Sequence, residues 1–182
     1  MRNIEIKARC AELARAREVA RRLGAVSAGT QHQIDTYFCT SAGPDAGKIG
    51  SPSDRARLKL REGEKTELIW YRRPDESGPK ASDYAVAPVA YAEQLRAVLS
   101  SALGTWVTVE KTRELWLLEN VRIHLDEVRG LGSFLEFEAV VGADHSESLC
   151  LAGLRRLLEA FEITEQDLIA GSYSDLLARR GA

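Results

Sequence analysis

The chain has 182 residues, of which 45% are hydrophobic and 29% charged, and its formal net charge at pH 7 is −2. This length and composition are typical of one globular domain with a sizeable core, so we expect a single domain over residues 1–182. The near-neutral charge disfavours a general nucleic-acid or membrane-surface binder, although it leaves room for a locally basic pocket.

Periodicity predicts about eight strands separated by turns and helices. Alternation of apolar and polar residues, or enrichment in β-branched and aromatic residues, indicates strands over 3–9, 31–39, 55–61, 66–73, 82–87, 106–118, 121–127 and 132–141. Helical spacing of apolar residues predicts helices over 11–23, 88–104, 146–160 and 164–180. Pro88 can open the second helix, and Thr164 with Asp167 forms a capping signature for the last.

The segment 40–54 is predicted to be a polar loop, and part of it imitates a phosphate-binding P-loop. Gly43-Pro44-Asp45-Ala46-Gly47-Lys48-Ile49 has three residues between its glycines and an isoleucine after its lysine. A P-loop needs four residues between the glycines and Ser or Thr after the lysine. We therefore reject a P-loop here.

Cysteine usage and the N-terminus point to a reducing compartment. Cys10, Cys39 and Cys150 are far apart and form no C-x-x-C pair, which favours free thiols. The first residues lack the apolar run of a signal peptide, and no stretch approaches the length of a membrane span. A cytoplasmic location without membrane contact is the expectation.

Charged residues on several predicted strands are sorted by sign. One face of the third strand carries four cations with no acid between them: Arg55, Arg57, Lys59 and Arg61. Like charges this close repel each other unless a nearby anion neutralises them. On the last strand, two glutamates at i and i+2 lie roughly 7 Å apart by strand rise, which suits one or two hard cations.

Two arrangements can accommodate these strands. The simplest is a sheet with a solvated, charged outer face. The other is a closed barrel, in which inward-facing positions alternate with outward-facing ones on every strand. Arginines and lysines would then face Glu5, Asp126, Glu136 and Glu138 across one interior. A polyphosphate with a bound divalent metal would suit that interior, because Arg and Lys bind phosphate oxygens and carboxylates bind the metal.

A set of short motifs resembles the CYTH, or triphosphate tunnel metalloenzyme, superfamily. In order, they are Asn3-Ile4-Glu5-Ile6-Lys7, Asp35-Thr36-Tyr37-Phe38, Arg57-Leu58-Lys59-Leu60-Arg61, Lys111-Thr112-Arg113, Arg122 and Phe134-Leu135-Glu136-Phe137-Glu138. Tyr173-Ser174-Asp175-Leu176-Leu177 resembles the class IV adenylate cyclase branch. The resemblance implies an α+β fold, an eight-stranded antiparallel barrel or tunnel with flanking helices. It also implies Mg²⁺ or Mn²⁺ as cofactor, and hydrolysis or cyclisation of a triphosphate.

The resemblance also implies roles for individual residues. Metal ligands would be Glu5, Glu136, Glu138 and Asp126; phosphate-binding residues Arg57, Lys59, Arg61, Arg72 and Arg122; and catalytic residues Lys7, Lys111 and Arg113. Two departures stand out: Asn3 replaces the first glutamate of the opening motif, and Ser82-Asp83-Tyr84 lacks the basic residue often found on the fifth strand.

Three functions stay open at this point. The first is a metal-dependent enzyme that converts ATP to cyclic AMP and pyrophosphate or hydrolyses ATP, tripolyphosphate or thiamine triphosphate. The second is a non-catalytic polyphosphate or nucleotide binder, which Asn3 favours. The third is a structural barrel with internally paired charges. A homodimer formed through leucines of 149–158 is an alternative to simple core packing.

The remaining polar candidates are expected to be structural. His32, His124 and His145 are scattered, so no histidine-based metal site is expected. Asp35 and Tyr37 are expected to be structural, and Ser174 and Asp175 to lie on an ordinary helix surface.

Overall fold

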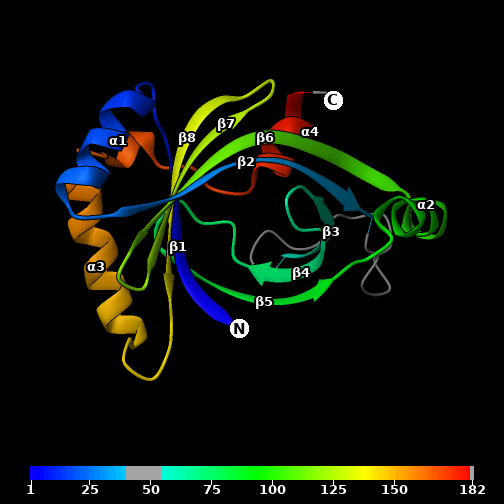
Figure 1. The fold of residues 1–182 in the computed structure, drawn as a ribbon, viewed down its shortest axis with the longest axis horizontal. Coiled ribbons are helices and arrows are strands. Elements are labelled where there is room, and N and C mark those ends of the chain that lie inside the picture. Colours follow the sequence, from blue (N-terminus) through cyan, green and yellow to red (C-terminus); the bar gives the residue numbers. More distant parts are fainter. Residues whose placement is uncertain (40–54, 181–182) are drawn as a thin grey trace.

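Eight antiparallel strands form a closed barrel in the computed structural model, which describes residues 1–39 and 55–180. Around the barrel the order is β1-β5-β4-β3-β2-β6-β7-β8, and β8 pairs back onto β1 (Figure 1). The strands are β1 Arg2–Arg9, β2 Val26–Phe38, β3 Arg55–Glu62, β4 Glu67–Arg73, β5 Lys80–Pro88, β6 Thr105–Leu118, β7 Val121–Val128 and β8 Gly132–Val140. This confirms the predicted α+β barrel; the predicted loop over 40–54, with its P-loop-like sequence, lies outside the described residues.

The helices flank the barrel, and two of them depart from the prediction. They are α1 Leu13–Arg22, α2 Ala92–Leu103, α3 Glu147–Ala160, a 3₁₀ turn Glu165–Asp167 and α4 Tyr173–Arg180. Pro88 does not open a helix. It is the last residue of β5, opposite Glu67, and α2 begins only at Ala92.

The helix predicted over 164–180 is interrupted. The capping box of Thr164 and Asp167 is present, but it starts a single 3₁₀ turn. The chain then runs beside β1, where Ile169 N donates a hydrogen bond to Lys7 O, and Gly171 takes a φ of +81° before α4 begins. Pairing with β1 and the left-handed glycine end the helix, since neither is compatible with continued helical hydrogen bonding.

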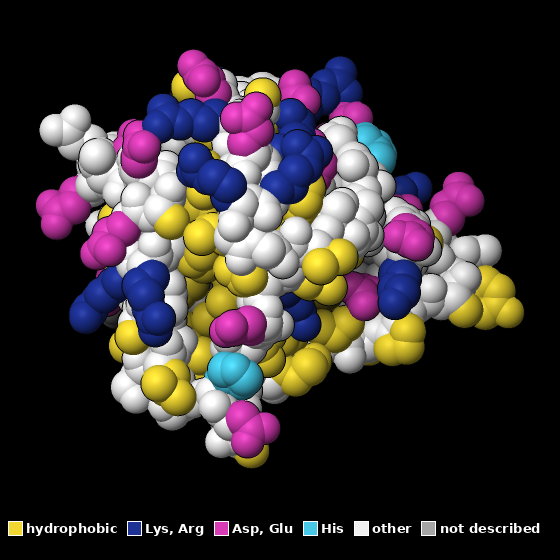
Figure 2. Space-filling view, turned by 60° about the vertical axis from the view of Figure 1, so that its left-hand side comes forward, with side chains coloured by type: hydrophobic (Ala, Val, Ile, Leu, Met, Phe, Trp, Pro, Cys, Tyr) yellow, Lys and Arg dark blue, Asp and Glu magenta, His cyan; other side chains and the backbone are white. Residues whose placement is uncertain are grey.

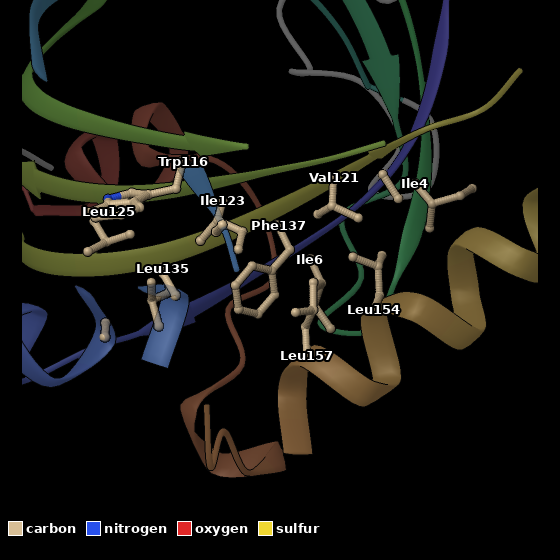
Figure 3. Close-up of a cluster of buried hydrophobic side chains, with 14 of the residues drawn as sticks. Ile4, Ile6, Trp116, Val121, Ile123, Leu125, Leu135, Phe137, Leu154 and Leu157 are labelled. Atoms are coloured by element: carbon tan, nitrogen blue, oxygen red, sulfur yellow. The ribbon is translucent and has the colours of Figure 1, made fainter. Parts of the chain in front are cut away.

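The main hydrophobic core lies outside the barrel, between its wall and helices α1 and α3 (Figures 1 and 3). On β1, Ile4 and Ile6 point outward, and on β8 Leu135 and Phe137 do the same. Leu154 and its neighbours on α3 cover them. Because the apolar positions of these strands face the helices, the alternating polar positions face the interior.

A second, smaller cluster closes one end of the barrel. Tyr173 at the start of α4 packs against Phe134 with ring centroids 5.0 Å apart, and Val109, Val128 and Ile169 complete the contact. The C-terminal segment therefore acts as the floor of the interior.

The outer surface has a different charge pattern. On the face shown in Figure 2, Lys and Arg side chains are interspersed with Asp and Glu side chains.

The three cysteines are free thiols, as predicted. Within residues 1–39 and 55–180, none of the helices has the length and apolarity needed to cross a membrane.

Candidate functional site

The barrel encloses a cavity of about 420 Å³ whose lining is strongly charged. Inward-facing strand residues form most of the lining, and Ser172 and Tyr173 complete it at the α4 end. Its charged residues are the cations Lys7, Lys59, Arg61, Arg73, Lys111, Arg113 and Arg122 and the carboxylates Glu5, Glu67, Glu136 and Glu138. The excess of cations suits an anionic guest.

The carboxylates of β1 and β8 form an acidic group on one side of the cavity. In the register of these strands Glu5 lies opposite Glu138, and Lys7 lies opposite Glu136. Residues opposite each other on one sheet face have Cβ atoms about 4.5–5.5 Å apart. Burial raises the pKa of Glu5, and the neighbouring Glu136 and Glu138 raise it further, against the lowering effect of its ion pair with Arg73.

Glu136 is held as an anion by two cations. Lys7 Nζ lies 2.6 Å from Glu136 Oε1, and Arg113 Nη2 lies 2.6 Å from Glu136 Oε2. Burial alone would raise the pKa of Glu136, but Lys7 and Arg113 hold it well below its usual range. Its neighbour Glu138 is less constrained, because its nearest cation, Arg122, lies 3.6 Å away with 42% of its side chain exposed.

A basic group from β3 and β6 surrounds one buried carboxylate on β2. Asp35 accepts hydrogen bonds from Lys59 Nζ at 2.8 Å, Arg61 Nε at 3.0 Å and Lys111 Nζ at 3.1 Å. Burial would raise the pKa of Asp35, but Lys111, Lys59 and Arg61 hold it well below its usual range. Since one carboxylate cannot neutralise three cations, this group retains positive charge for a ligand.

The same crowding changes the basicity of a lysine. Burial, reinforced by the nearby Arg61 and Lys111 cations, lowers the pKa of Lys59 to about 7, despite its hydrogen bond to Asp35. A bound phosphate would favour the charged form of this amine.

Arg113 joins the basic and acidic groups at the floor of the cavity. Besides Glu136, it binds Asp126, with Nε 2.6 Å from Oδ1. Asp126 is fully buried, and its Oδ2 also accepts a hydrogen bond of 2.7 Å from the Tyr173 hydroxyl. Although burial raises the pKa of Asp126, Arg113 lowers it well below its usual range.

Asp126 is therefore not placed as a metal ligand. Unlike Glu5, Glu136 and Glu138, it does not line the cavity. Its position suits the orientation of Arg113 instead.

Two predicted phosphate-binding arginines also lie away from the cavity. Arg57 is turned toward α4, where its Nη2 donates a 2.7 Å hydrogen bond to Asp175 Oδ1, and it lies over the Trp106 ring at 5.0 Å. Arg72 is exposed on the outer face of β4. The inward-facing cation of this strand is Arg73, so the prediction was one residue too early and on the wrong face of the strand.

Arg73 and Lys80 supply the positive charge of the β4–β5 side. Arg73 is buried, forms an ion pair with Glu5 and donates a 3.0 Å hydrogen bond to Gly171 O. Lys80 opens β5 directly opposite Glu5. Burial, together with Arg73, lowers the pKa of Lys80 to about 8. Lys80 is thus a basic residue on the fifth strand, so the expectation that this strand lacks one is wrong.

The structure brings most of the predicted site residues together. Those lining the cavity are Lys7, Lys59, Arg61, Lys111, Arg113, Arg122, Glu5, Glu136 and Glu138, whereas Arg57, Arg72 and Asp126 do not line it.

Sequence reasoning missed two kinds of residue. His124 is buried on β7 directly opposite Glu136, and its alternation with Arg122 on a charged strand was the available signal. Ser174 and Asp175 are buried and do not lie on an exposed helix surface. No local pattern in the sequence predicts that α4 packs against the end of the barrel.

The donor set fits a divalent cation. Glu5, Glu136 and Glu138 present carboxylates to one cavity, and His124, Glu136 and Glu138 offer ligand atoms within 4.8 Å of one another. Asn3 adds a buried side-chain oxygen, Oδ1, that has no hydrogen-bond partner among the described residues. Carboxylate and amide oxygens are ligands that divalent cations accept, so these residues could hold one.

Comparison with known proteins gives a consistent result. The CYTH domain matches residues 1–173 of this chain. A curated relative, a proposed adenylate cyclase of Methanocaldococcus jannaschii, is 25% identical over 140 residues, which is 77% of this chain. The aligned part spans only 64% of that relative's length.

Solved structures share the fold at low sequence identity. A Pyrococcus horikoshii protein superposes with a TM-score of 0.79 at 20% identity, over 96% of this chain and 98% of that one. A proposed adenylate cyclase of Vibrio parahaemolyticus gives 0.75 at 17% identity, over 97% of both chains. A proposed adenylyl cyclase of Hippeastrum, described as having a dominant triphosphatase activity, gives 0.62 at 18%, over 98% and 96%.

Proposed function

Because the chain belongs to the CYTH domain family, we propose that it is a divalent-metal-dependent enzyme acting on a triphosphate held inside its barrel. The observation that carries this proposal is the meeting of acidic and basic groups in one cavity, with Glu5, Glu136 and Glu138 on β1 and β8 and Lys59 and Lys111 on β3 and β6. A metal-bound triphosphate needs both kinds of partner at once.

The basic group would bind the phosphate chain. Lys59, Arg61 and Lys111 converge on Asp35, which fixes their positions and leaves part of their charge unanswered. Lys111 would contact the reacting phosphate, and Arg122, exposed at the cavity edge, would bind an outer phosphate oxygen. Charge-assisted hydrogen bonds of this kind both position the chain and neutralise developing charge.

Lys7 and Arg113 act through Glu136. By holding one oxygen each, they keep this carboxylate ionised and oriented toward the cavity. A divalent ion held by Glu5, Glu136 and Glu138, when bound, would neutralise the phosphate charge that grows as the leaving group departs. The protein's contribution is therefore positioning and electrostatic neutralisation, as in phosphoryl transfer generally.

Two reactions fit this site. If water attacks the terminal phosphate, the enzyme is a triphosphate hydrolase; if a ribose 3′-hydroxyl attacks the α-phosphate, it is a cyclase that forms cyclic AMP and pyrophosphate. The β4–β5 side of the cavity carries Ile69, Tyr71, Tyr84 and Val86, which leaves an apolar wall beside the charges. This wall could receive the organic part of ATP or thiamine triphosphate, whereas tripolyphosphate would use the charged part alone.

The test is turnover by the purified protein. It is incubated with ATP, tripolyphosphate or thiamine triphosphate and either Mg²⁺ or Mn²⁺, and orthophosphate, pyrophosphate and cyclic AMP are measured. We expect metal-dependent turnover of at least one substrate, which the Glu136→Ala and Glu138→Gln variants lose. Glu127→Gln, on the outward face of β7, serves as the matched control and should keep it. Absence of turnover with every substrate and metal would refute catalysis.

A non-catalytic triphosphate binder is the second candidate, and Asn3 favours it. This side chain offers a neutral oxygen where a fourth carboxylate would strengthen metal binding. Tight binding of tripolyphosphate in calorimetry, without product formation, would support this candidate over the enzyme.

A further inference from the structure

His124 is placed among the carboxylates of the cavity in a way that the proposed metal site does not use. It projects from β7, is only 4% exposed and lies directly opposite Glu136 in the register of β7 and β8. Its Nδ1 lies 3.5 Å from Glu136 Oε2, and its Nε2 lies 4.0 Å from Glu138 Oε2.

These separations are longer than those of ordinary hydrogen bonds. One ligand atom from each of His124, Glu136 and Glu138 lies within 4.8 Å of the other two, so a small side-chain movement would bring all three within reach of one metal ion. Hydrogen bonds between nitrogen and oxygen have lengths of about 2.7–3.2 Å. Two ligand atoms that are each about 2.2 Å from a metal lie no more than about 4.4 Å apart. Within the described residues, no shorter hydrogen bond holds the imidazole of His124.

The two glutamates beside His124 differ in their ion-pair partners. Glu136 is already bound by Lys7 and Arg113, so a metal ion would share its oxygens with these two cations. Among the lysines and arginines of the described residues, Glu138 pairs with the half-exposed Arg122 alone, 3.6 Å away. The side of the imidazole next to Glu138 is therefore where positive charge is least supplied.

A second observation points to a bound cation on the same side of the cavity. Asn3 is only 4% exposed, and its buried Oδ1 atom has no hydrogen-bond partner among the described residues. Asn3 and Glu138 both line the cavity. Asn3 lies two residues before Glu5 on β1, and Glu5 is the cross-strand partner of Glu138. A buried carbonyl oxygen without a donor is costly unless a cation or water satisfies it.

We propose that His124, together with Glu136 and Glu138, binds the metal ion through an imidazole nitrogen. The ion selected is then a first-row divalent transition metal such as Mn²⁺ in preference to Mg²⁺, because Mg²⁺ keeps an octahedral shell of oxygens, whereas the transition metals from Mn²⁺ to Zn²⁺ also bind nitrogen ligands. The inference rests on the proposed function for the use of this ion, but not for its binding.

The competing explanation is an imidazolium that bridges two carboxylates without any metal. It predicts that His124 stabilises the fold and never coordinates an added ion. The two explanations differ in one direct observable, the bond between a histidine nitrogen and the metal.

The test uses Mn²⁺ alone, added to the untagged full chain without triphosphate, and pulsed EPR to detect ¹⁴N coupling. We expect the coupling in the unaltered protein and its loss in His124→Gln. His32→Gln is the matched control, because His32 is exposed and pairs with Glu110 on the outer surface, and it should keep the coupling. No Mn²⁺ binding, no coupling in the unaltered protein, or coupling that persists in His124→Gln would each overturn the proposal.

A second variant tests selectivity and covers the case in which His124→Gln does not fold. His124→Asp provides an all-oxygen site, so the ratio of Mn²⁺ to Mg²⁺ affinity should fall at least tenfold, since even outer partners of metal ligands change affinity by about 10–100-fold. An unchanged ratio would contradict the proposal. Failure of triphosphate turnover with the ¹⁴N coupling intact would instead refute only the proposed function.

Discussion

Replacing Asp35 by Asn removes the negative charge that three buried cations share. Asp35 is fully buried and lies 2.8–3.1 Å from Lys59, Arg61 and Lys111. Removing one partner of a buried ion pair costs about 3–5 kcal/mol, because the remaining charge is left uncompensated. Asn keeps the shape and part of the hydrogen bonding, so we expect the free energy of unfolding to fall by about 3 kcal/mol. For a chain of this length, that loss lowers the melting temperature by roughly 6–12 °C.

A triphosphate should reverse this loss, which separates a phosphate site from a purely structural ion cluster. A ligand that binds only the native state stabilises it by RT ln(1 + [L]/Kd). In the Asp35→Asn variant, the three cations are free for phosphate, so tripolyphosphate should raise its melting temperature more than that of the unaltered protein.

The assay is thermal unfolding of both proteins with and without tripolyphosphate, with Asp83→Asn as the matched control. Asp83 pairs with Arg2 at 3.4 Å on the exposed surface, where such pairs contribute about 0–1 kcal/mol. If Asp35→Asn and Asp83→Asn have the same melting temperature in the absence of ligand, the reasoning about uncompensated charge is wrong. If tripolyphosphate stabilises it no more than the unaltered protein, the cluster is not a phosphate site.

Two further predictions concern the basic residues. Arg73→Ala should lower the free energy of unfolding in urea by about 3–5 kcal/mol, because it leaves the buried Glu5 without its ion-pair partner. Arg72→Ala, on the exposed outer face, should lower it by no more than about 1 kcal/mol. Equal effects would refute the assignment of Arg73 as the inward residue. Since the pKa of Lys59 is lowered to about 7, triphosphate binding near pH 8 should draw a proton onto this amine, and affinity should fall as pH rises from 7 to 9. Calorimetry in buffers of different ionisation enthalpy should find less proton uptake in Lys59→Met than in the unaltered protein, and no difference would contradict the role of Lys59.

Which residues share a face of each strand could be predicted because they follow a local rule, whereas the closed barrel was an expectation from the resemblance to the CYTH superfamily. Alternation at period two on β1 and β8 determines that Ile4 and Phe137 face one way and Glu5 and Glu136 the other. The absence of acids between Arg57, Lys59 and Arg61 then indicated that this face is not an ordinary surface. Both conclusions need only the sequence of one strand at a time.

The errors arose where the outcome depends on packing between distant segments. Arg72 and Arg73 are adjacent, and only the register of β4 with its neighbours decides which one faces inward. Arg57 is drawn away from the cavity by Asp175, which lies 118 residues later in a helix whose position no local pattern reveals. Asp126 likewise accepts a hydrogen bond from the hydroxyl of Tyr173, which belongs to that same helix.

The surroundings of His124 also depend on packing between strands. Histidines scattered along a sequence argue against a metal site only if the strands that carry them stay apart. The β7–β8 register places His124 opposite Glu136, so a single histidine finds its partners on the next strand.

The central claim is that the acidic and basic groups inside the barrel bind one triphosphate between them. A crystal structure with a non-hydrolysable triphosphate analogue and Mn²⁺ tests it most directly. We predict phosphate oxygens on Lys59, Arg61 and Lys111 and the ion on Glu138 within the cavity. A ligand bound on the outer surface, or a cavity that holds only water at saturating ligand, would contradict it.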